Sequence, residues 1–254
     1  MLEDKKLFIL DMDGTVYLGD RLFPETLPFL DRVTSSGKRY LFFTNNASRS
    51  PETYVTRLSN MGIPATRAEI LTSGDVTIHF LKTHRAGKSV YIVGTEDLIQ
   101  SFQAEGILLN DEDPDIVLVS FDTTLTYEKL EKACRFIREG AEFLSTHPDY
   151  NCPVEGGFIP DSGSICALVT ASTGKEPRYF GKPYPETLEM LMETTGCAKE
   201  DMVVVGDRLY TEIAMGVNNG VDAVLVLSGE TSMADVEASD IKPDYIVDTI
   251  GDLL

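Results

Sequence analysis

Three clusters of polar residues each follow a short apolar run of the kind that forms a buried strand. They are Asp11-Met12-Asp13-Gly14-Thr15, Thr44-Asn45-Asn46 and Gly206-Asp207-Arg208. A fourth cluster, Gly181-Lys182-Pro183, precedes a predicted helix. Ligands of open parallel sheets bind outside the carboxyl ends of the strands. We therefore expect these clusters to form one site if their strands are neighbours.

The residue types at these positions are suited to phosphoryl transfer. Asp11, Asp13 and Asp207 would repel one another and raise their own pKa values unless a cation lay among them. Carboxylate oxygens suit a hard cation such as Mg²⁺, which also accepts a phosphate oxygen from a substrate. Thr44, the N–H groups after it and Lys182 supply hydrogen-bond donors and positive charge for that phosphate.

The order and spacing of the clusters resemble the four motifs of the haloacid-dehalogenase (HAD) superfamily over the whole chain. Asp11 to Thr44 spans 33 residues, which is too short for an inserted domain, whereas Thr44 to Lys182 spans 138. The second interval has room for a domain of about 100 residues. This placement resembles the NagD-like, p-nitrophenyl phosphatase branch, which includes nucleotide, sugar and pyridoxal phosphate phosphatases.

The resemblance implies a role for each candidate residue. Asp11 would be the nucleophile that forms an aspartyl-phosphate, and Asp13 the general acid and base. Mg²⁺ would be held by Asp11, the main-chain carbonyl of Asp13, and Asp207. The remaining residues would bind the transferring phosphoryl group: Thr44, Asn45, Asn46 and Lys182. Asp13 also favours ester hydrolysis over dehalogenation, because a halide leaves without a proton.

Two features depart from the family pattern or extend it. Glu212 stands where the family usually has Asp, so we expect it either to orient a metal-bound water or Lys182, or to be an ordinary acid in the first turn of a helix. Tyr150, Asn151 and Cys152 lie in the aperiodic segment 147–163 and would contact the leaving group. The three histidines, His79, His84 and His147, are scattered and are interpreted as surface or structural residues.

Apolar runs alternate with amphipathic segments along the chain, which predicts an α/β fold. The domains expected are a doubly wound, Rossmann-like core at 1–80 and 180–254 and an inserted α/β cap at 81–179. Predicted helices are 23–36, 50–61, 75–83, 96–105, 127–139, 184–195 and 210–217. Predicted strands are 7–10, 40–43, 90–93, 116–121, 143–145, 166–170, 202–205, 223–227 and 245–247.

Composition excludes several classes of partner. The chain of 254 residues has 41 acidic and 22 basic side chains, a formal net charge of -19, so nucleic acids and anionic membranes are not expected partners. The first apolar run is too short for a signal peptide or a membrane span. Four cysteines without metal-ligand spacing indicate free thiols in a reducing cytoplasm. A homodimer formed through the cap is expected from the resemblance.

The sequence thus predicts a Mg²⁺-dependent phosphatase that acts on a small phosphorylated metabolite. Sugar phosphates, nucleotides and p-nitrophenyl phosphate are the substrate types considered. Two alternatives stay open at this point. One is a receiver-like signalling module with a long-lived phospho-Asp, and the other is a non-catalytic protein that binds a phosphorylated metabolite.

The charge of -19 leads to a prediction about salt. An acidic protein offers no broad positive field to steer an anionic ester toward its site, so raising the salt concentration should change kcat/KM by less than about twofold. Steady-state kinetics at several salt concentrations would measure this. A steep fall of kcat/KM with salt would contradict it.

Overall fold

The computed structural model describes residues 2–154 and 156–253, and these form two compact units. Unit 1 consists of residues 1–44, 51–71 and 182–254, and unit 2 of residues 45–50 and 72–181. The predicted cap boundaries, 81–179, differ from this division because helix α3 (Ser73–His84) and the short segment 45–50 belong to unit 2. Met1 and Leu254, in the predicted core, and Glu155, in the predicted aperiodic segment, lie outside the described residues.

Unit 1 is built on a six-stranded sheet with the order β15-β14-β13-β1-β4-β5. Its strands are β1 (Leu7–Leu10), β4 (Arg39–Thr44), β5 (Ile70–Thr72), β13 (Met202–Gly206), β14 (Asp222–Val226) and β15 (Tyr245–Val247). Strand β1 is parallel to both of its neighbours, β4 and β13, and all four of its residues are buried. The strand order reverses between β1 and β13, which is where ligands bind in doubly wound sheets.

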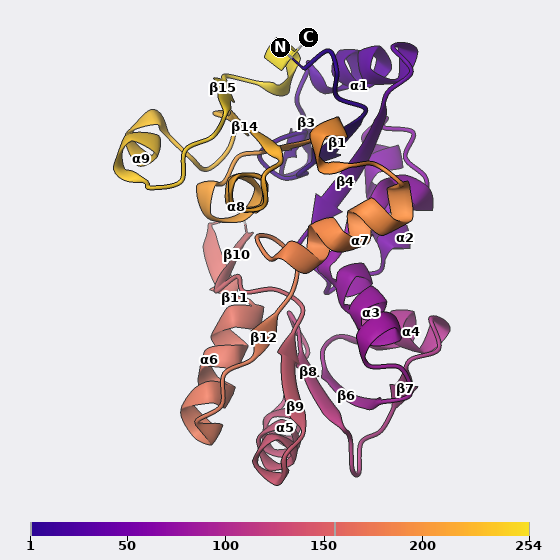
Figure 1. Ribbon diagram of the computed structural model, residues 1–254. Coiled ribbons are helices and arrows are strands. Elements are labelled where there is room, and N and C mark those ends of the chain that lie inside the picture. Colours follow the sequence, from indigo (N-terminus) through magenta and orange to yellow (C-terminus); the bar gives the residue numbers. More distant parts are fainter. Residues whose placement is uncertain (1, 155, 254) are drawn as a thin grey trace. The chain divides into compact units, whose positions relative to one another are not determined.

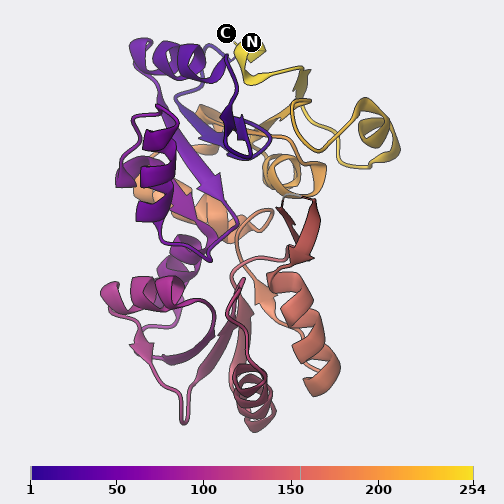
Figure 2. The same ribbon diagram turned by 180° about the vertical axis from the view of Figure 1, so that it is seen from behind.

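The helices of unit 1 bury an apolar core against this sheet (Figures 1 and 2). They are α1 (Thr26–Ser35), α2 (Pro51–Asn60), α7 (Pro185–Thr195), α8 (Ala214–Asn219) and α9 (Met233–Ala238). A short hairpin of β2 (Tyr17–Leu18) and β3 (Arg21–Leu22) follows β1. Phe8 and Phe29 meet edge to face at 5.7 Å and join β1 to α1. Helix α1 begins at Thr26, three residues after the predicted start, and the Thr26 hydroxyl donates to the carbonyl of Val16 at 2.7 Å.

Unit 2 contains a second parallel sheet with the order β12-β9-β8-β6-β7. The strands are β6 (Ser89–Val93), β7 (Leu108–Leu109), β8 (Ile116–Val119), β9 (Glu142–Ser145) and β12 (Arg178–Tyr179). Helices α5 (Tyr127–Glu139) and α6 (Ser162–Thr173) pack on it through one shared apolar cluster. Helices α3 and α4 (Glu96–Ala104) lie on the side away from α6 in both views (Figures 1 and 2). The predicted fold class, a doubly wound core with an inserted α/β domain, is confirmed.

Two secondary-structure predictions in unit 2 were wrong. The expected strand 166–170 is the middle of helix α6, which begins after the cap residue Asp161 and ends at the left-handed Gly174. Ile165, Cys166 and Val169 face the sheet, and so short an apolar run does not distinguish a helix from a strand. The aperiodic segment 147–163 contains a hairpin of β10 (Asn151–Val154) and β11 (Gly157–Pro160). Most residues of this hairpin are exposed, so no alternating pattern marks them.

The predicted helix 210–217 is a π-helical turn, Leu209–Ile213, that continues into α8. Single π-helical turns occur frequently at functional sites. None of the described helices is long and apolar enough to cross a membrane.

Candidate active site

Lys182 joins three segments of unit 1 at the carboxyl ends of its central strands. Its ammonium group lies 2.5 Å from Asp11 Oδ1 and 2.5 Å from Glu212 Oε1. It also donates to the carbonyl of Phe43, the residue before Thr44, at 3.0 Å. Only 3 % of the Lys182 side chain is exposed. The structure therefore brings Asp11, the end of β4, Lys182 and the π-helical turn together, as the strand-end argument predicted.

Asp207 lies against the loop that follows Asp11. A Cβ atom on Gly14 would overlap Asp207 Oδ2, and Gly14 has a φ of +89°, so a residue with a side chain would be both strained and obstructed there. Asp207 Oδ2 accepts the N–H of Glu230 at 2.7 Å. Asp207 Oδ1 is buried and has no hydrogen-bond partner among the described residues. A buried carboxylate oxygen without a donor is costly, and a cation would satisfy it.

The turn 228–230 is a part of this site that the sequence analysis missed. A Cβ atom on Gly229 would overlap Asp207 Oδ2, so the turn runs directly past the carboxylate. The hydroxyl of Ser228 donates to the carbonyl of Gly14 at 2.7 Å. The turn follows the end of β14, so the rule that found the other clusters could also have found this one.

Two acids of the site, Asp11 and Asp207, have raised pKa values. Burial raises the pKa of Asp11 to about 8, with Lys182 lowering it in part and the charges of Glu212 and Asp207 raising it further. Burial raises the pKa of Asp207 to about 6, again with a contribution from Glu212. At neutral pH and without a cation, the site therefore holds more protons than ordinary aspartates would.

Glu212 is the acid that stays ionised. Burial would raise its pKa, but Lys182 and Arg208 outweigh burial and lower it. Lys182 in turn has a raised pKa, because the charges of Asp11 and Glu212 outweigh the effect of its burial. Of the two roles left open for Glu212, contact with Lys182 is the one that the structure shows. A Cβ atom on Gly206 would overlap Glu212, so that glycine makes room for the longer side chain.

Asp13 differs from the other acids because its side chain reaches solvent. Partial burial raises its pKa, and a hydrogen bond from the Gly19 N–H and the charge of Arg57 oppose the shift. A carboxyl group with a raised pKa and access to solvent can both give and take a proton.

The remaining predicted residues are divided between the two units. Thr44 ends β4 in unit 1, whereas Asn45 and Asn46 belong to unit 2. Tyr150, which is 60 % exposed, precedes the β10–β11 hairpin, and Asn151 and Cys152 lie on β10. All four cysteines are free thiols. His147, interpreted as a surface or structural residue, is fully buried in unit 2.

Comparison with known proteins agrees with this fold. A sequence model described as haloacid dehalogenase-like hydrolase matches residues 8–108, and a second, HAD-hydrolase-like, matches 179–253. The chain is 35% identical over 245 residues to an acid sugar phosphatase of Staphylococcus aureus, covering 96% of this chain and 95% of that protein. It is 34% identical over 245 residues to a 5'-nucleotidase of Bacillus subtilis, covering 96% of both.

Solved structures show the same relationship. The 4-nitrophenylphosphatase of Thermotoga maritima superposes with a TM-score of 0.95 at 44% identity, covering 99% of this chain and 97% of that one. NagD of E. coli superposes with a TM-score of 0.92 at 29% identity, with 98% of both chains covered. The fold and site therefore define a hydrolase. The chain belongs to the haloacid dehalogenase-like hydrolase family, and the predicted likeness to its NagD-like, p-nitrophenyl phosphatase branch is confirmed.

The opposite pKa shifts of Glu212 and Asp11 predict opposite effects of neutralising them in metal-free protein. The folded state favours the charge on Glu212, so Glu212→Gln should lower the free energy of unfolding by about 3 kcal/mol, the cost of breaking a buried ion pair. The folded state disfavours the charge on Asp11, so Asp11→Asn should raise the free energy of unfolding.

Urea unfolding at neutral pH with a chelator would measure both changes. Asp31→Asn, on the exposed face of α1, is the matched control and should stay within about 0.5 kcal/mol of wild type. A Glu212→Gln protein as stable as wild type, or an Asp11→Asn protein less stable than wild type, would contradict this account of the charges.

Proposed function

We propose that the protein is a Mg²⁺-dependent phosphatase that hydrolyses small phosphomonoesters through an aspartyl-phosphate on Asp11. The substrate types in view are sugar phosphates, nucleotides and p-nitrophenyl phosphate. The observation that carries the proposal is the pairing of Asp11, whose side chain is 14 % exposed, with Lys182 beside Asp207, whose Oδ1 has no donor among the described residues. The family assignment and the phosphatase names of the relatives support the same activity.

The residues present fit a hard divalent cation. The candidate ligands are carboxylate and carbonyl oxygens, namely Asp11, the main-chain carbonyl of Asp13, and Asp207. Burial, together with the nearby negative charges, raises the pKa values of Asp11 and Asp207, and such an ion would favour their ionised forms. When bound, Mg²⁺ would offset negative charge on the phosphoryl group and on these carboxylates.

The chain's own residues then account for two displacements. Asp11 forms a bond from a carboxylate oxygen to phosphorus while the bond from phosphorus to the leaving oxygen breaks. Asp13 gives its proton to that leaving oxygen. In the second step Asp13 takes a proton from water as the water oxygen bonds to phosphorus, and the bond to Asp11 breaks. Lys182 keeps Asp11 in place and offsets charge on the phosphoryl group.

Binding of the substrate is assigned to the residues predicted for it. Thr44, Asn45 and Asn46 would bind the phosphoryl group together with Lys182. The leaving group would contact Tyr150, Asn151 and Cys152 of the β10 segment. Exposure of Tyr150 is consistent with that role, since 60 % of its surface is accessible.

A cytoplasmic setting is part of the same proposal. The four free cysteines and the net charge of -19 support a cytoplasmic protein that binds neither nucleic acid nor membrane. The proposed partner is a small phosphorylated metabolite, and a homodimer through the inserted domain stays a prediction.

Asp11→Asn gives the sharpest test of the proposed mechanism. An amide is not a nucleophile toward phosphorus, so the variant should lose at least about 10³-fold in kcat for p-nitrophenyl phosphate. Phosphate release from purified, folded protein with Mg²⁺ measures the effect, and Asp31→Asn should keep the wild-type rate. Wild-type turnover by Asp11→Asn would rule out the aspartyl-phosphate.

A further inference from the structure

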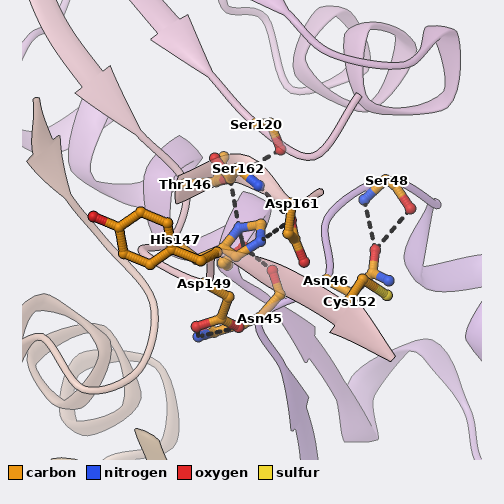
Figure 3. Close-up of polar contacts among 12 residues, drawn as sticks. Asn45, Asn46, Ser48, Ser120, Thr146, His147, Asp149, Cys152, Asp161 and Ser162 are labelled. Carbon is orange, nitrogen blue, oxygen red and sulfur yellow. Dashed lines mark hydrogen bonds and ion pairs between the residues drawn. The ribbon is translucent and has the colours of Figure 1, made fainter. Parts of the chain in front are cut away.

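A network of buried polar side chains in unit 2 holds the segment 45–50 in place (Figure 3). The Ser73 hydroxyl donates to the carbonyl of Asn45 at 2.5 Å. The Asn45 amide nitrogen donates to both carboxylate oxygens of Asp149, each at 3.3 Å. Further along, the Thr95 hydroxyl donates to the carbonyl of Ser48 at 2.7 Å. Side chains on several elements of unit 2 therefore fix this short segment.

His147 lies at the centre of the network and is fully buried (Figure 3). Its Nε2 is 2.8 Å from Asp161 Oδ1. Its Nδ1 is 2.9 Å from the hydroxyl oxygen of Thr146 and 3.4 Å from that of Ser73. The same Ser73 hydroxyl contacts Asn45, so two successive hydrogen bonds connect the imidazole to the segment 45–50.

The donors and acceptors of the network fix the protons on the ring. The single hydroxyl proton of Ser73 goes to the Asn45 carbonyl, which can only accept. The Thr146 hydroxyl donates to Ser120 Oγ at 2.9 Å. Both hydroxyls therefore present lone pairs to Nδ1 of His147, and Nδ1 must donate.

The other ring nitrogen also carries a proton. Asp161 Oδ1 accepts the N–H of Ser162 at 2.5 Å, as the cap of helix α6, and faces Nε2 of His147 as a second donor. Asp149 is the other acid near the ring, because one ligand atom of each of His147, Asp149 and Asp161 lies within 4.8 Å of the others. Burial of the ring disfavours its charged form, whereas the two carboxylates beside it favour that form.

We propose that His147 is an imidazolium that acts as a positioning residue for phosphoryl binding. Its Nδ1–H holds the Ser73 oxygen, and Ser73 holds the Asn45 carbonyl. That carbonyl shares a rigid peptide plane with the N–H of Asn46, so its hydrogen bond sets the direction in which this N–H points. The inference rests on the proposed function, in which Asn45 and Asn46 bind the phosphoryl group.

A cation held by His147, Asp149 and Asp161 is the competing explanation of the same cluster. A metal on Nε2 requires that nitrogen to be unprotonated, which would remove the hydrogen bond to Asp161. The protonation of the ring therefore separates the two explanations.

Nitrogen-15 NMR of the histidine rings tests the protonation directly. The chain has three histidines, and His147→Gln and His84→Gln assign their signals. In chelator-treated wild type at neutral pH, both nitrogens of His147 should be protonated. One unprotonated nitrogen, or a change of the His147 signals when Mg²⁺ or Zn²⁺ alone is added, would overturn the proposal.

Kinetics of two variants tests the positioning role. His147→Gln replaces the ring with a side-chain amide, which can donate a hydrogen bond but cannot hold a charge. Ser73→Ala removes only the hydroxyl that links the ring to Asn45. Both should raise the KM for p-nitrophenyl phosphate and the inhibition constant of inorganic phosphate about tenfold, with a smaller change in kcat, because the phosphoryl group is bound in the ground state too. Ser73→Ala should retain the doubly protonated His147 ring.

The exposed His84→Gln is the control and should match wild type in both constants. If folded Ser73→Ala keeps wild-type phosphate affinity, His147 does not position this segment and the inference is wrong. If the wild type releases no phosphate from any ester, only the proposed function fails. The ring protonation and the affinity of the variants for inorganic phosphate would still decide the inference.

Discussion

The contact of Lys182 with Asp11 and Glu212 is the interaction on which the rest of the site depends. Without an ammonium group beside them, Asp11, Glu212 and Asp207 would place three negative charges close together in a largely buried site. The free energy needed to bury isolated charges exceeds the free energy of unfolding of a typical protein. The π-helical turn and the small Gly206 allow Glu212 to reach Lys182, and the third hydrogen bond of Lys182 goes to the strand that leads to Thr44.

This arrangement suggests how a protein with a net charge of -19 can bind an anionic substrate. The site keeps Asp11 and Asp207 at raised pKa values, so their affinity for protons can be exchanged for affinity for a cation. In the proposed function, that cation, Lys182 and the N–H groups after β4 would together reverse the potential locally. The segment that carries those N–H groups is fixed by unit 2, through Ser73, Asp149 and Thr95.

Much of the fold followed from sequence because the strands of a buried parallel sheet are continuous apolar runs with polar residues at their ends. Asp11 and Asp207 were placed correctly at the ends of β1 and β13 for that reason. Helix α6 was predicted as a strand because the apolar run 166–170 shows no helical period. Leu168, on the exposed side of the helix, is apolar like the buried Cys166 and Val169. The buried His147 contacts Ser73, 74 residues away, and Asp161, 14 residues away, and contacts between residues so far apart leave no local signal in the sequence.

Proton release on metal binding tests most directly whether the raised pKa values of Asp11 and Asp207 make protons compete with a cation for these carboxylates. Because both pKa values are raised in metal-free protein, Mg²⁺ binding should release protons at neutral pH, and its affinity should rise as the pH rises from about 6 to about 8. Titration calorimetry in two buffers of different ionisation enthalpy measures this. We expect proton release in wild type and less in Asp11→Asn. Mg²⁺ binding without proton release, or no binding at all, would contradict the account.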